Sequence, residues 1–247
     1  MEHMHERKTG ETVAAGIRRS IAKGELLIGD HLPTEEELTE YYGIARTTLR
    51  EALRILESQG LIRIRRGRGG GATVSMPDLE RLAEPLAVVL QLRQTTFGDL
   101  DEARSLIEPR LAAWLARKHT EEDLAALRAV VGMASTAADQ DDRVAFGAAA
   151  ALMHGTIIER AGNNTLSVIS QVLHRLVLDR YTVAALGSDQ ALMRRAVRSF
   201  WKLVDIIADG DPERAQDHWE KQMSWVMAQS RDELIDIYDD GRPTITD

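Results

Sequence analysis

The sequence predicts a mainly α-helical chain in two parts: a small domain of helices and a β-hairpin over residues 1–76, and an all-α bundle of about seven helices over residues 77–247. Apolar residues recur with helical spacing along most of the chain, and the abundant alanine and leucine favour helices. Only residues 61–64 and 72–74 have the character of strands. The Ser-Met-Pro-Asp stretch at 75–78 reads as a short linker between the two parts.

Composition and hydropathy exclude several classes of protein. Hydrophobic residues make up 44% of the chain and charged residues 28%, which is typical of a globular protein. There is no cysteine, which excludes disulfides, thiolate metal sites and a cysteine nucleophile. The N-terminus lacks the apolar core of a signal peptide, and the longest apolar run, 82–92, is too short to span a membrane. We therefore expect a cytoplasmic protein with no membrane partner.

Charge is distributed unevenly along the chain. The net charge is −8, but residues 41–76 sum to +5, which leaves −13 for the remainder. A basic module attached to an acidic body presents one cationic surface to a polyanion. The distribution favours nucleic acid as the partner of the N-terminal part.

Two helices are predicted before residue 45. Apolar residues recur every four positions from near Thr12 to Gly24, which predicts the first helix. The second begins after Thr34, which forms a capping box with the glutamate three residues later. We expect Tyr41 to face inward and Gly43 to adopt a positive φ in the following turn.

A third helix opens at residues 45–48 and ends at Gly60. Arg46, Arg50 and Arg54 are spaced by four and should line one exposed face. The buried stripe on the other face is formed by Leu49, Ala52, Leu53 and Leu56. Followed by a hairpin whose tip is the cationic, glycine-rich run 65–71, this order of elements is that of a winged helix-turn-helix.

The third helix and the hairpin tip have the chemistry needed to contact duplex DNA. A helix fits the major groove, where arginine grips guanine and threonine bonds phosphates or bases, while arginines on a flexible wing enter a groove or neutralise phosphates. The alternative is that the arginines form a solvated face and that the glycine-rich run is only a flexible turn. We predict DNA contacts from Thr34, Arg46, Thr47, Thr48, Arg50, Arg65, Arg66, Gly67 and Arg68.

Residues 10–75 also resemble the DNA-binding domain of the GntR family. The resemblance is carried by the runs 29–35, 37–38, 43–44, 46–53, 56–57 and 60–62. It implies DNA contacts from Arg46, Thr47, Thr48, Arg50 and the Arg66-Gly67 pair, and a dimer on a short pseudo-palindrome. The chain departs from the family pattern at Glu36, usually arginine, and at Ala45, often serine or threonine. These departures bear on the operator sequence.

Seven helical segments are predicted beyond the linker, separated by caps and glycines: 79–94, 99–118, 120–138, 142–161, 164–186, 188–209 and 211–238. This part resembles the FCD-type ligand-sensing domain of the FadR subfamily. The resemblance is carried by Arg104 with Glu108 and by the segments 111–113, 153–154, 162–163 with 166, and 208–211 with 215.

The resemblance implies a ligand site in the helical domain. Many such domains hold a divalent metal through one aspartate and three histidines, but the matching positions here are Ala150, His154, Phe200 and Gln222, so we predict no metal site and no cofactor. A residual site using His154 with His218 stays open. The three histidines His119, His174 and His218 are spread over different segments and show no ligand-like spacing.

For the effector we predict contacts from Arg104, His154, Phe200 and Gln222. Arg104 would clamp a carboxylate or phosphate, or alternatively only pair with the glutamate four residues later. His154 is more simply a satisfied core histidine. Phe200 suits a fatty acyl, acyl-CoA or other lipophilic effector, and core packing explains it as well.

Together these features predict a ligand-responsive, homodimeric DNA-binding transcriptional regulator, a repressor rather than an enzyme, controlled by a small organic acid, acyl-CoA or lipophilic effector. No nucleophile elbow, phosphate loop or metal-binding helix pair appears in the sequence. Two alternatives remain open. One is an all-helical interaction module, and the other is a metal-dependent carboxylate sensor with weakened DNA binding.

Overall fold

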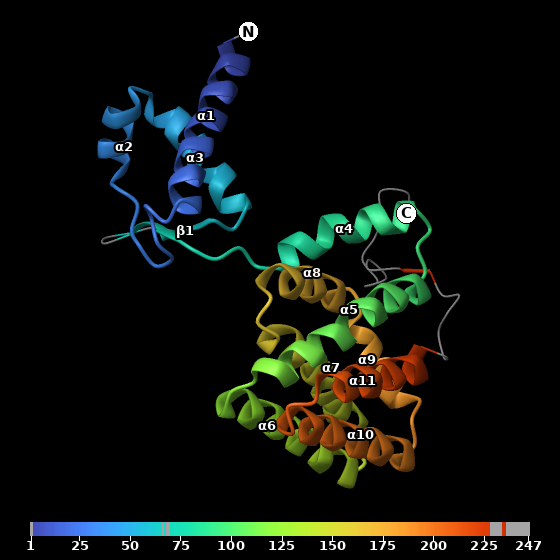
Figure 1. The fold of residues 1–247 in the computed structure, drawn as a ribbon. Coiled ribbons are helices and arrows are strands. Elements are labelled where there is room, and N and C mark those ends of the chain that lie inside the picture. The colour runs from blue at the N-terminus through green and yellow to red at the C-terminus, as the bar shows by residue number, and fades with distance from the viewer. Residues whose placement is uncertain (1, 66, 68–69, 228–233, 236–247) are drawn as a thin grey trace. The chain divides into compact units, whose positions relative to one another are not determined.

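The computed structural model describes residues 2–65, 67, 70–227 and 234–235. The chain divides into two compact units, Met1–Arg81 and Leu82–Asp247. In the described part there are eleven helices and one two-stranded sheet (Figure 1), so the predicted mainly α architecture is confirmed. Among the described helices, none combines the length and the apolar character needed to cross a membrane.

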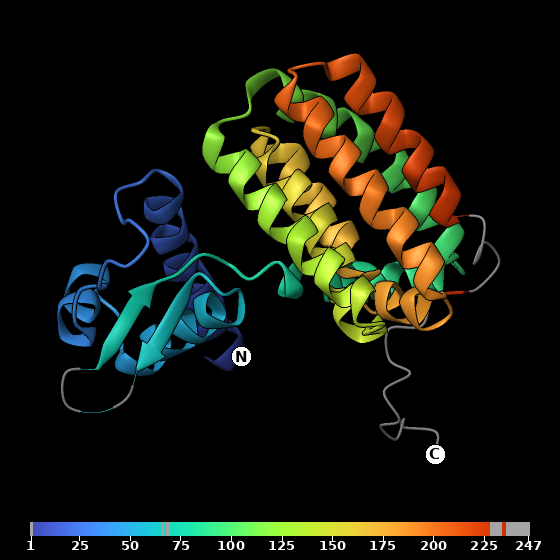
Figure 2. The ribbon, with the colours of Figure 1, turned by 90° about the horizontal axis from the view of Figure 1, so that it is seen from below.

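The N-terminal unit contains three helices followed by a hairpin, in the predicted order. These elements are α1 (Glu2–Ala22), α2 (Glu35–Tyr42), α3 (Arg46–Ser58), β1 (Ile62–Arg65) and β2 (Gly71–Val74). The two strands are antiparallel and lie side by side in Figure 2, with Ile62 opposite Val74. The first helix begins at Glu2 rather than near Thr12.

The core of this unit forms where α3 packs against α1. The predicted stripe of α3 is confirmed, since Leu49, Ala52 and Leu56 are completely buried and Leu53 nearly so. The prediction for Tyr41 is wrong, because its side chain is 81% exposed. Tyr42 packs against the core instead, and its hydroxyl would lie 3.0 Å from a Cβ at Gly16, so the glycine makes room for the ring.

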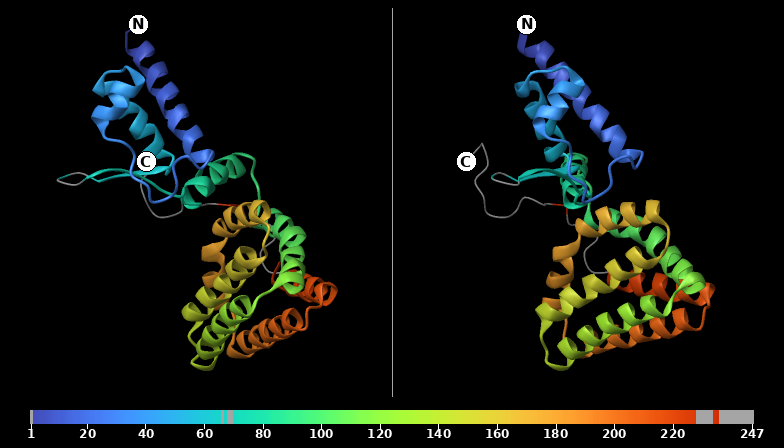
Figure 3. Two further views of the ribbon diagram at one scale, coloured as in Figure 1. Left: turned by 60° about the vertical axis from the view of Figure 1, so that its left-hand side comes forward. Right: turned by 90° about the vertical axis from the view of Figure 1, so that its left-hand side faces the viewer.

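The second unit is a bundle of helices, seen from two further sides in Figure 3. Within it α5 packs along α11, and α6 packs along both α7 and α10. Its elements are α4 (Glu80–Leu92), α5 (Phe97–Lys118), α6 (Glu121–Asp139), α7 (Arg143–Arg160), α8 (Asn164–Arg175), α9 (Leu178–Leu186), α10 (Gln190–Ala208) and α11 (Pro212–Met227).

Two predicted helices of the bundle differ from the structure. The segment 164–186 is two helices, because the chain turns at Leu176 and Val177, and Val177 is buried in a small cluster with Phe97 and Leu100. This packing replaces the glycine or proline that usually signals a break. The last predicted helix, 211–238, is helical as far as Met227, where the described stretch stops, and the described residues 234–235 are not helical.

The C-terminal residues 234–235 return to the start of α5. Leu234 forms an isolated antiparallel bridge with Thr96, and the Ile235 amide donates to the Thr95 carbonyl at 3.0 Å. The Ile235 side chain is buried in the same small cluster as Phe97. An extended segment therefore lies where the sequence predicts helix.

Candidate functional site

The N-terminus of α3 presents uncapped backbone amides beside an arginine. Arg46 is the first residue of α3, and the preceding Ala45 has extended backbone and makes no side-chain cap bond. By contrast α2 begins with a complete capping box between Thr34 and Glu37, as predicted. Helix N-termini that lack a side-chain cap can satisfy their amides with an anion such as phosphate.

Three of the four predicted side chains on α3 point outward. Arg46, Thr47 and Arg50 are exposed. Thr48 is only 6% exposed and belongs to the buried side of the helix. Thr34 is exposed, but its hydroxyl donates to the Glu37 carboxylate at 2.8 Å and accepts from the Glu37 amide at 3.2 Å, so it serves the cap.

The exposed arginines of α3 take part in weak, solvated ion pairs. Arg50 Nε lies 3.3 Å from Glu35 Oε2, with side chains 64% and 45% exposed. Arg54 Nη1 lies 4.0 Å from Glu51 Oε2. Exposed pairs of this kind contribute about 0–1 kcal/mol, so a phosphate can replace the carboxylate at little cost.

The hairpin holds its cationic tip on a short, well-registered ladder. Arg65 ends β1 opposite Gly71, and its side chain is exposed. Gly67 has φ 107°, a conformation that L side chains rarely adopt, and a Cβ at Gly70 would lie 2.2 Å from the Arg65 carbonyl oxygen. Gly67 and Gly70 are thus required by the backbone of the tip. Arg66 and Arg68 lie outside the described residues.

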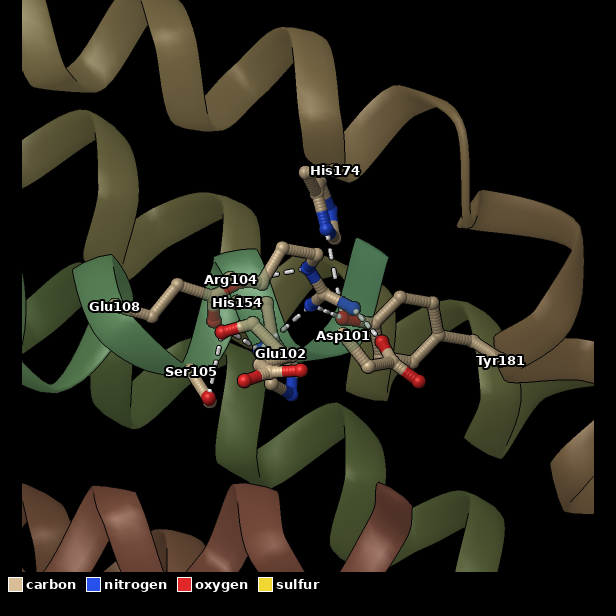
Figure 4. Close-up of polar contacts among 8 residues, drawn as sticks. All are labelled: Asp101, Glu102, Arg104, Ser105, Glu108, His154, His174 and Tyr181. Atoms are coloured by element: carbon tan, nitrogen blue, oxygen red, sulfur yellow. Dashed lines mark hydrogen bonds and ion pairs between the residues drawn. The ribbon is translucent and has the colours of Figure 1, made fainter. Parts of the chain in front are cut away.

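A buried polar cluster lies in the second unit, around Arg104 (Figure 4). Arg104 and Glu108 come from α5, one turn apart, and are 5% and 0% exposed. The remaining members come from neighbouring helices, namely His154 of α7, His174 of α8 and Tyr181 of α9. Close packing of α9 on α7 depends on Gly147, where a Cβ would lie 2.9 Å from the Tyr181 carbonyl oxygen.

Arg104 is surrounded by partners from its own chain. Its Nε donates to Glu108 Oε1 at 2.8 Å, and its Nη1 donates to Asp101 Oδ1 at 2.9 Å. Its Nη2 donates to the Tyr181 hydroxyl and lies 3.4 Å from His154 Nδ1. The i,i+4 pairing with Glu108 that the sequence offered as an alternative is present, but in a buried setting.

His154 is oriented by the same carboxylate. Its Nδ1 lies 2.6 Å from Glu108 Oε2. An ionised carboxylate only accepts hydrogen bonds, so His154 Nδ1 is the donor. On the other side of the cluster, His174 Nδ1 lies 3.4 Å from the Tyr181 hydroxyl, and the His154 and His174 rings stack with centroids 6.2 Å apart.

Electrostatics fix the charge states of this cluster. Burial alone would raise the pKa of Glu108, but the charges of Arg104 and His154 outweigh it and lower the pKa to about 2. Burial is the main cause that lowers the pKa of His174, and the nearby charges of His154 and Arg104 lower it further, to about 3. Burial raises the pKa of Tyr181 against the opposing effect of Arg104. At neutral pH Glu108 is ionised, and His174 and Tyr181 are neutral.

Of the predicted effector residues, the structure brings Arg104 and His154 together. Phe200 lies beside Trp219, whose ring centroid is 6.1 Å from that of Phe200 and 4.7 Å from that of His154. Gln222 is half-buried on α11, one turn beyond Trp219.

The residues present do not fit a divalent metal. At the pattern positions, Ala150 and Phe200 offer no donor atom and Gln222 is a weak ligand, so His154 is the one strong donor among the four. His218, the second histidine of the alternative residual site, lies on α11 with its Nε2 2.8 Å from the Ser199 carbonyl oxygen. Within the described residues, no group of three or more histidine, cysteine, aspartate or glutamate side chains could hold a metal ion.

Sequence reasoning missed several members of the cluster. Asp101, Tyr181 and Trp219 were not predicted, and His174 was set aside because it lacked ligand-like spacing. Tyr181 is 77 positions from Arg104 in the chain. The i,i+3 spacing of Asp101 and Arg104 was a signal for the first of these residues, and no local spacing points to Tyr181 or Trp219.

Two family models match the chain. The model described as "Bacterial regulatory proteins, gntR family" matches residues 9–71, and the model described as "FCD domain" matches residues 99–224. Together they cover the helix-turn-helix with most of its wing and nearly the whole helical bundle. The fold and both sites therefore define a class, that of one-chain regulators with a DNA-binding head and a helical sensing domain.

Curated relatives and a solved structure agree with these matches. The chain is 30% identical over 232 residues to the uncharacterized HTH-type transcriptional regulator YcbG of Bacillus subtilis, covering 93% of this chain and 91% of that protein. It is 26% identical over 211 residues to the galactonate operon transcriptional repressor of Escherichia coli, covering 83% and 90%. Streptococcus agalactiae GntR has the same fold, with a TM-score of 0.65 and 24% identity, covering 89% of this chain and 99% of that one.

The chain belongs to the GntR family and carries an FCD-type C-terminal domain. It is a DNA-binding transcriptional regulator, and its family consists of such regulators rather than enzymes. Its placement in the FadR subfamily stays a prediction.

Proposed function

We propose that this protein is a cytoplasmic, homodimeric repressor that binds a short pseudo-palindromic operator. The observation that carries the proposal is the exposed, uncapped start of α3, where Arg46 and Arg50 lie one turn apart. A helix in the major groove reads bases with residues of its first turns, and a dimer reads two half-sites. Arg46, Thr47 and Arg50 would contact bases and phosphates, with Thr48 left out because it is buried.

The wing would add contacts that are independent of the base sequence. Its cationic run contains Arg65, Arg66, Gly67 and Arg68, and arginines on a glycine-rich tip can neutralise phosphates or enter the minor groove. These contacts would increase affinity and its dependence on salt. Thr34 would support the interface indirectly, by capping α2.

We further propose that a small organic acid controls operator affinity through the Arg104 cluster, without a metal ion. Support comes from the buried guanidinium and from the absence of fitting metal donors at the pattern positions. The name of one relative refers to galactonate, which is a carboxylic acid. A polar, charged cluster favours an organic acid over a wholly lipophilic effector or the long chain of an acyl-CoA.

Selection from a random duplex library, followed by mobility-shift titration, tests this proposal. We expect enrichment of a two-fold symmetric site, and release of that site by one or more of a panel of small organic acids, equally with and without EDTA. Failure to enrich any duplex would favour the helical interaction module. Release that EDTA abolishes would favour the metal-dependent carboxylate sensor.

A further inference from the structure

The C-terminal end of α3 has no cation of its own. The last turn of this helix contains no basic residue, and its C-cap, Gln59, keeps a right-handed backbone. The last carbonyl groups of a helix have no partner within the helix, and they form the negative end of its dipole. A cation placed there bonds these carbonyls and offsets the dipole.

Arg81 supplies this cation from the start of α4. Its Nη1 donates to the carbonyl oxygen of Glu57 at 2.6 Å and to that of Ser58 at 3.1 Å. Glu57 and Ser58 are the last two residues of α3. A hydrogen bond from an ionised donor is stronger than one between neutral groups. The Arg81 guanidinium therefore caps α3, although it lies 23 positions beyond Ser58 in the chain.

Close packing at the end of α3 holds the following chain in place. Gly60 has φ 72°, and a Cβ there would lie 3.3 Å from Pro77 Cα and 3.4 Å from Arg81 Cδ. The Ser75 hydroxyl donates to the Gly60 carbonyl at 2.7 Å, and the Arg81 amide donates to the Asp78 carbonyl at 3.1 Å. The segment between β2 and α4 is thus fixed against α3 on either side of the guanidinium contact.

Arg81 has a particular place in the chain. It is the second residue of α4 and the last residue of the N-terminal unit, so its bonds to α3 lie within that unit. Beyond Arg81, α4 continues into the helical unit. The helix that holds the end of α3 is therefore one that both units share.

We propose that Arg81 positions α3 for reading the operator. The helix has 13 residues and is about 20 Å long, so a shift at its C-terminal end displaces Arg46 and Arg50 at its start. Contacts to base edges need aligned donors and acceptors, whereas contacts to phosphates depend mainly on charge. Loss of the cap should therefore weaken binding to the operator more than binding to unrelated DNA. The inference rests on the proposed operator binding by α3, and it adds a residue that acts through the helix.

Binding of the selected operator and of a scrambled duplex of equal length, over a range of salt concentrations, tests the inference. We expect Arg81→Ala to bind the operator about five- to tenfold more weakly and the scrambled duplex within about twofold of the wild type. The salt slope should match that of the wild type, because no phosphate contact is lost. Arg81→Lys keeps the charge and N–H donors and should recover most of the operator affinity. The matched control Arg93→Ala removes the same charge from an exposed position just beyond the other end of α4 and should behave like the wild type.

Three results for Arg81→Ala would overturn the inference. They are wild-type affinity for the operator, an equal loss of affinity for both duplexes, and a salt slope flattened by about one unit, which would make Arg81 a phosphate contact. If Arg81→Ala does not fold, Arg81→Gln replaces it, and the same three results decide. A wild type that enriches no duplex would refute the proposed operator binding and the inference together. A wild type that binds its operator beside an unaffected Arg81 variant would refute the inference alone.

Discussion

The same pair of side chains, arginine and glutamate, occurs in both units with opposite consequences. In the N-terminal unit Arg50 and Glu35 lie 3.3 Å apart and are 64% and 45% exposed. In the helical unit Arg104 and Glu108 lie 2.8 Å apart and are 5% and 0% exposed. The two distances are similar, but the first pair is surrounded by solvent and the second is buried.

Burial decides how readily an arginine can change its partner. Water screens the exposed pair, so Arg50 can exchange its carboxylate for a phosphate. Removal of one partner from the buried pair leaves an uncompensated charge in a low dielectric. The N-terminal arginines are thus suited to bind DNA reversibly, while an acid bound at the Arg104 cluster would have to compete with Glu108 and Asp101.

The largest expected effect comes from breaking the buried pair. Glu108→Ala leaves the Arg104 charge without its closest carboxylate and should lower the free energy of unfolding by about 3–5 kcal/mol. Urea unfolding of the purified protein measures this. Glu122→Ala, which removes an exposed partner of Arg160, is the matched control and should cost less than about 1 kcal/mol. Equal losses in the two variants would show that burial does not distinguish the pairs.

The second largest effect is a loss of stability on acidification. We expect His174 to be its main source between pH 6.5 and 4.5. Its pKa is about 3 in the folded protein, against about 6.5 in an unfolded chain. The unfolded state takes up the proton first, so the stability from neutral His174 is complete above pH 6.5 and is lost as the pH falls toward 3. The loss from pH 6.5 to 4.5 should be about 2–3 kcal/mol.

Comparison of the wild type with His174→Gln over this range isolates the effect. Glu108, with a pKa of about 2, acts in the same direction but only below about pH 4.5. Burial also lowers the pKa of His218, which both proteins share. The variant should lose less stability than the wild type on acidification. Parallel stability curves from pH 6.5 to 4.5 would contradict the assignment.

A smaller effect is expected at the uncapped start of α3. Ala45→Ser supplies the side-chain acceptor that the helix lacks and should stabilise the N-terminal unit by about 1 kcal/mol. Thermal unfolding followed by circular dichroism measures the change, with Ala45→Val as a control that adds no acceptor oxygen and is as poor an N-cap residue as alanine. No gain from serine would mean that the first amides of α3 already have a partner.

The smallest effect is expected from the exposed pair itself. Glu35→Gln removes the carboxylate that faces Arg50 and should tighten operator binding about two- to fivefold, or about 0.5–1 kcal/mol. Stability should change by less than about 1 kcal/mol. Weaker operator binding in this variant would imply that Glu35 holds Arg50 in its binding orientation.

Local signals in the sequence were sufficient for much of the fold. The capping box at Thr34 and the left-handed turn at Gly43 (φ 63°) are confirmed, because each depends on residues within one turn. The break at Leu176–Val177 was missed because tertiary packing, rather than a local breaker, ends the helix. Tyr41 was misassigned because two adjacent tyrosines compete for one inward position.

The site was less predictable than the fold, for a physical reason. Arg104 and His154 were identified, but their shared cluster depends on contacts between residues 50 and 77 positions apart. Periodicity reports which face of a helix is apolar, and it does not report which helices meet there. An i,i+4 Arg–Glu pair likewise looks the same in sequence whether it is solvated or buried.

The central claim is that the exposed arginines of α3 bind DNA. Its most direct test is the salt dependence of operator affinity for the double variant Arg46→Ala/Arg50→Ala. The control is Arg194→Ala, which removes an exposed arginine from α10. We expect the α3 variant to lose at least about 100-fold in affinity and to flatten the plot of log affinity against log salt by about two units. Arg194→Ala should match the wild type. An α3 variant that binds the operator with wild-type affinity and salt slope would contradict the account.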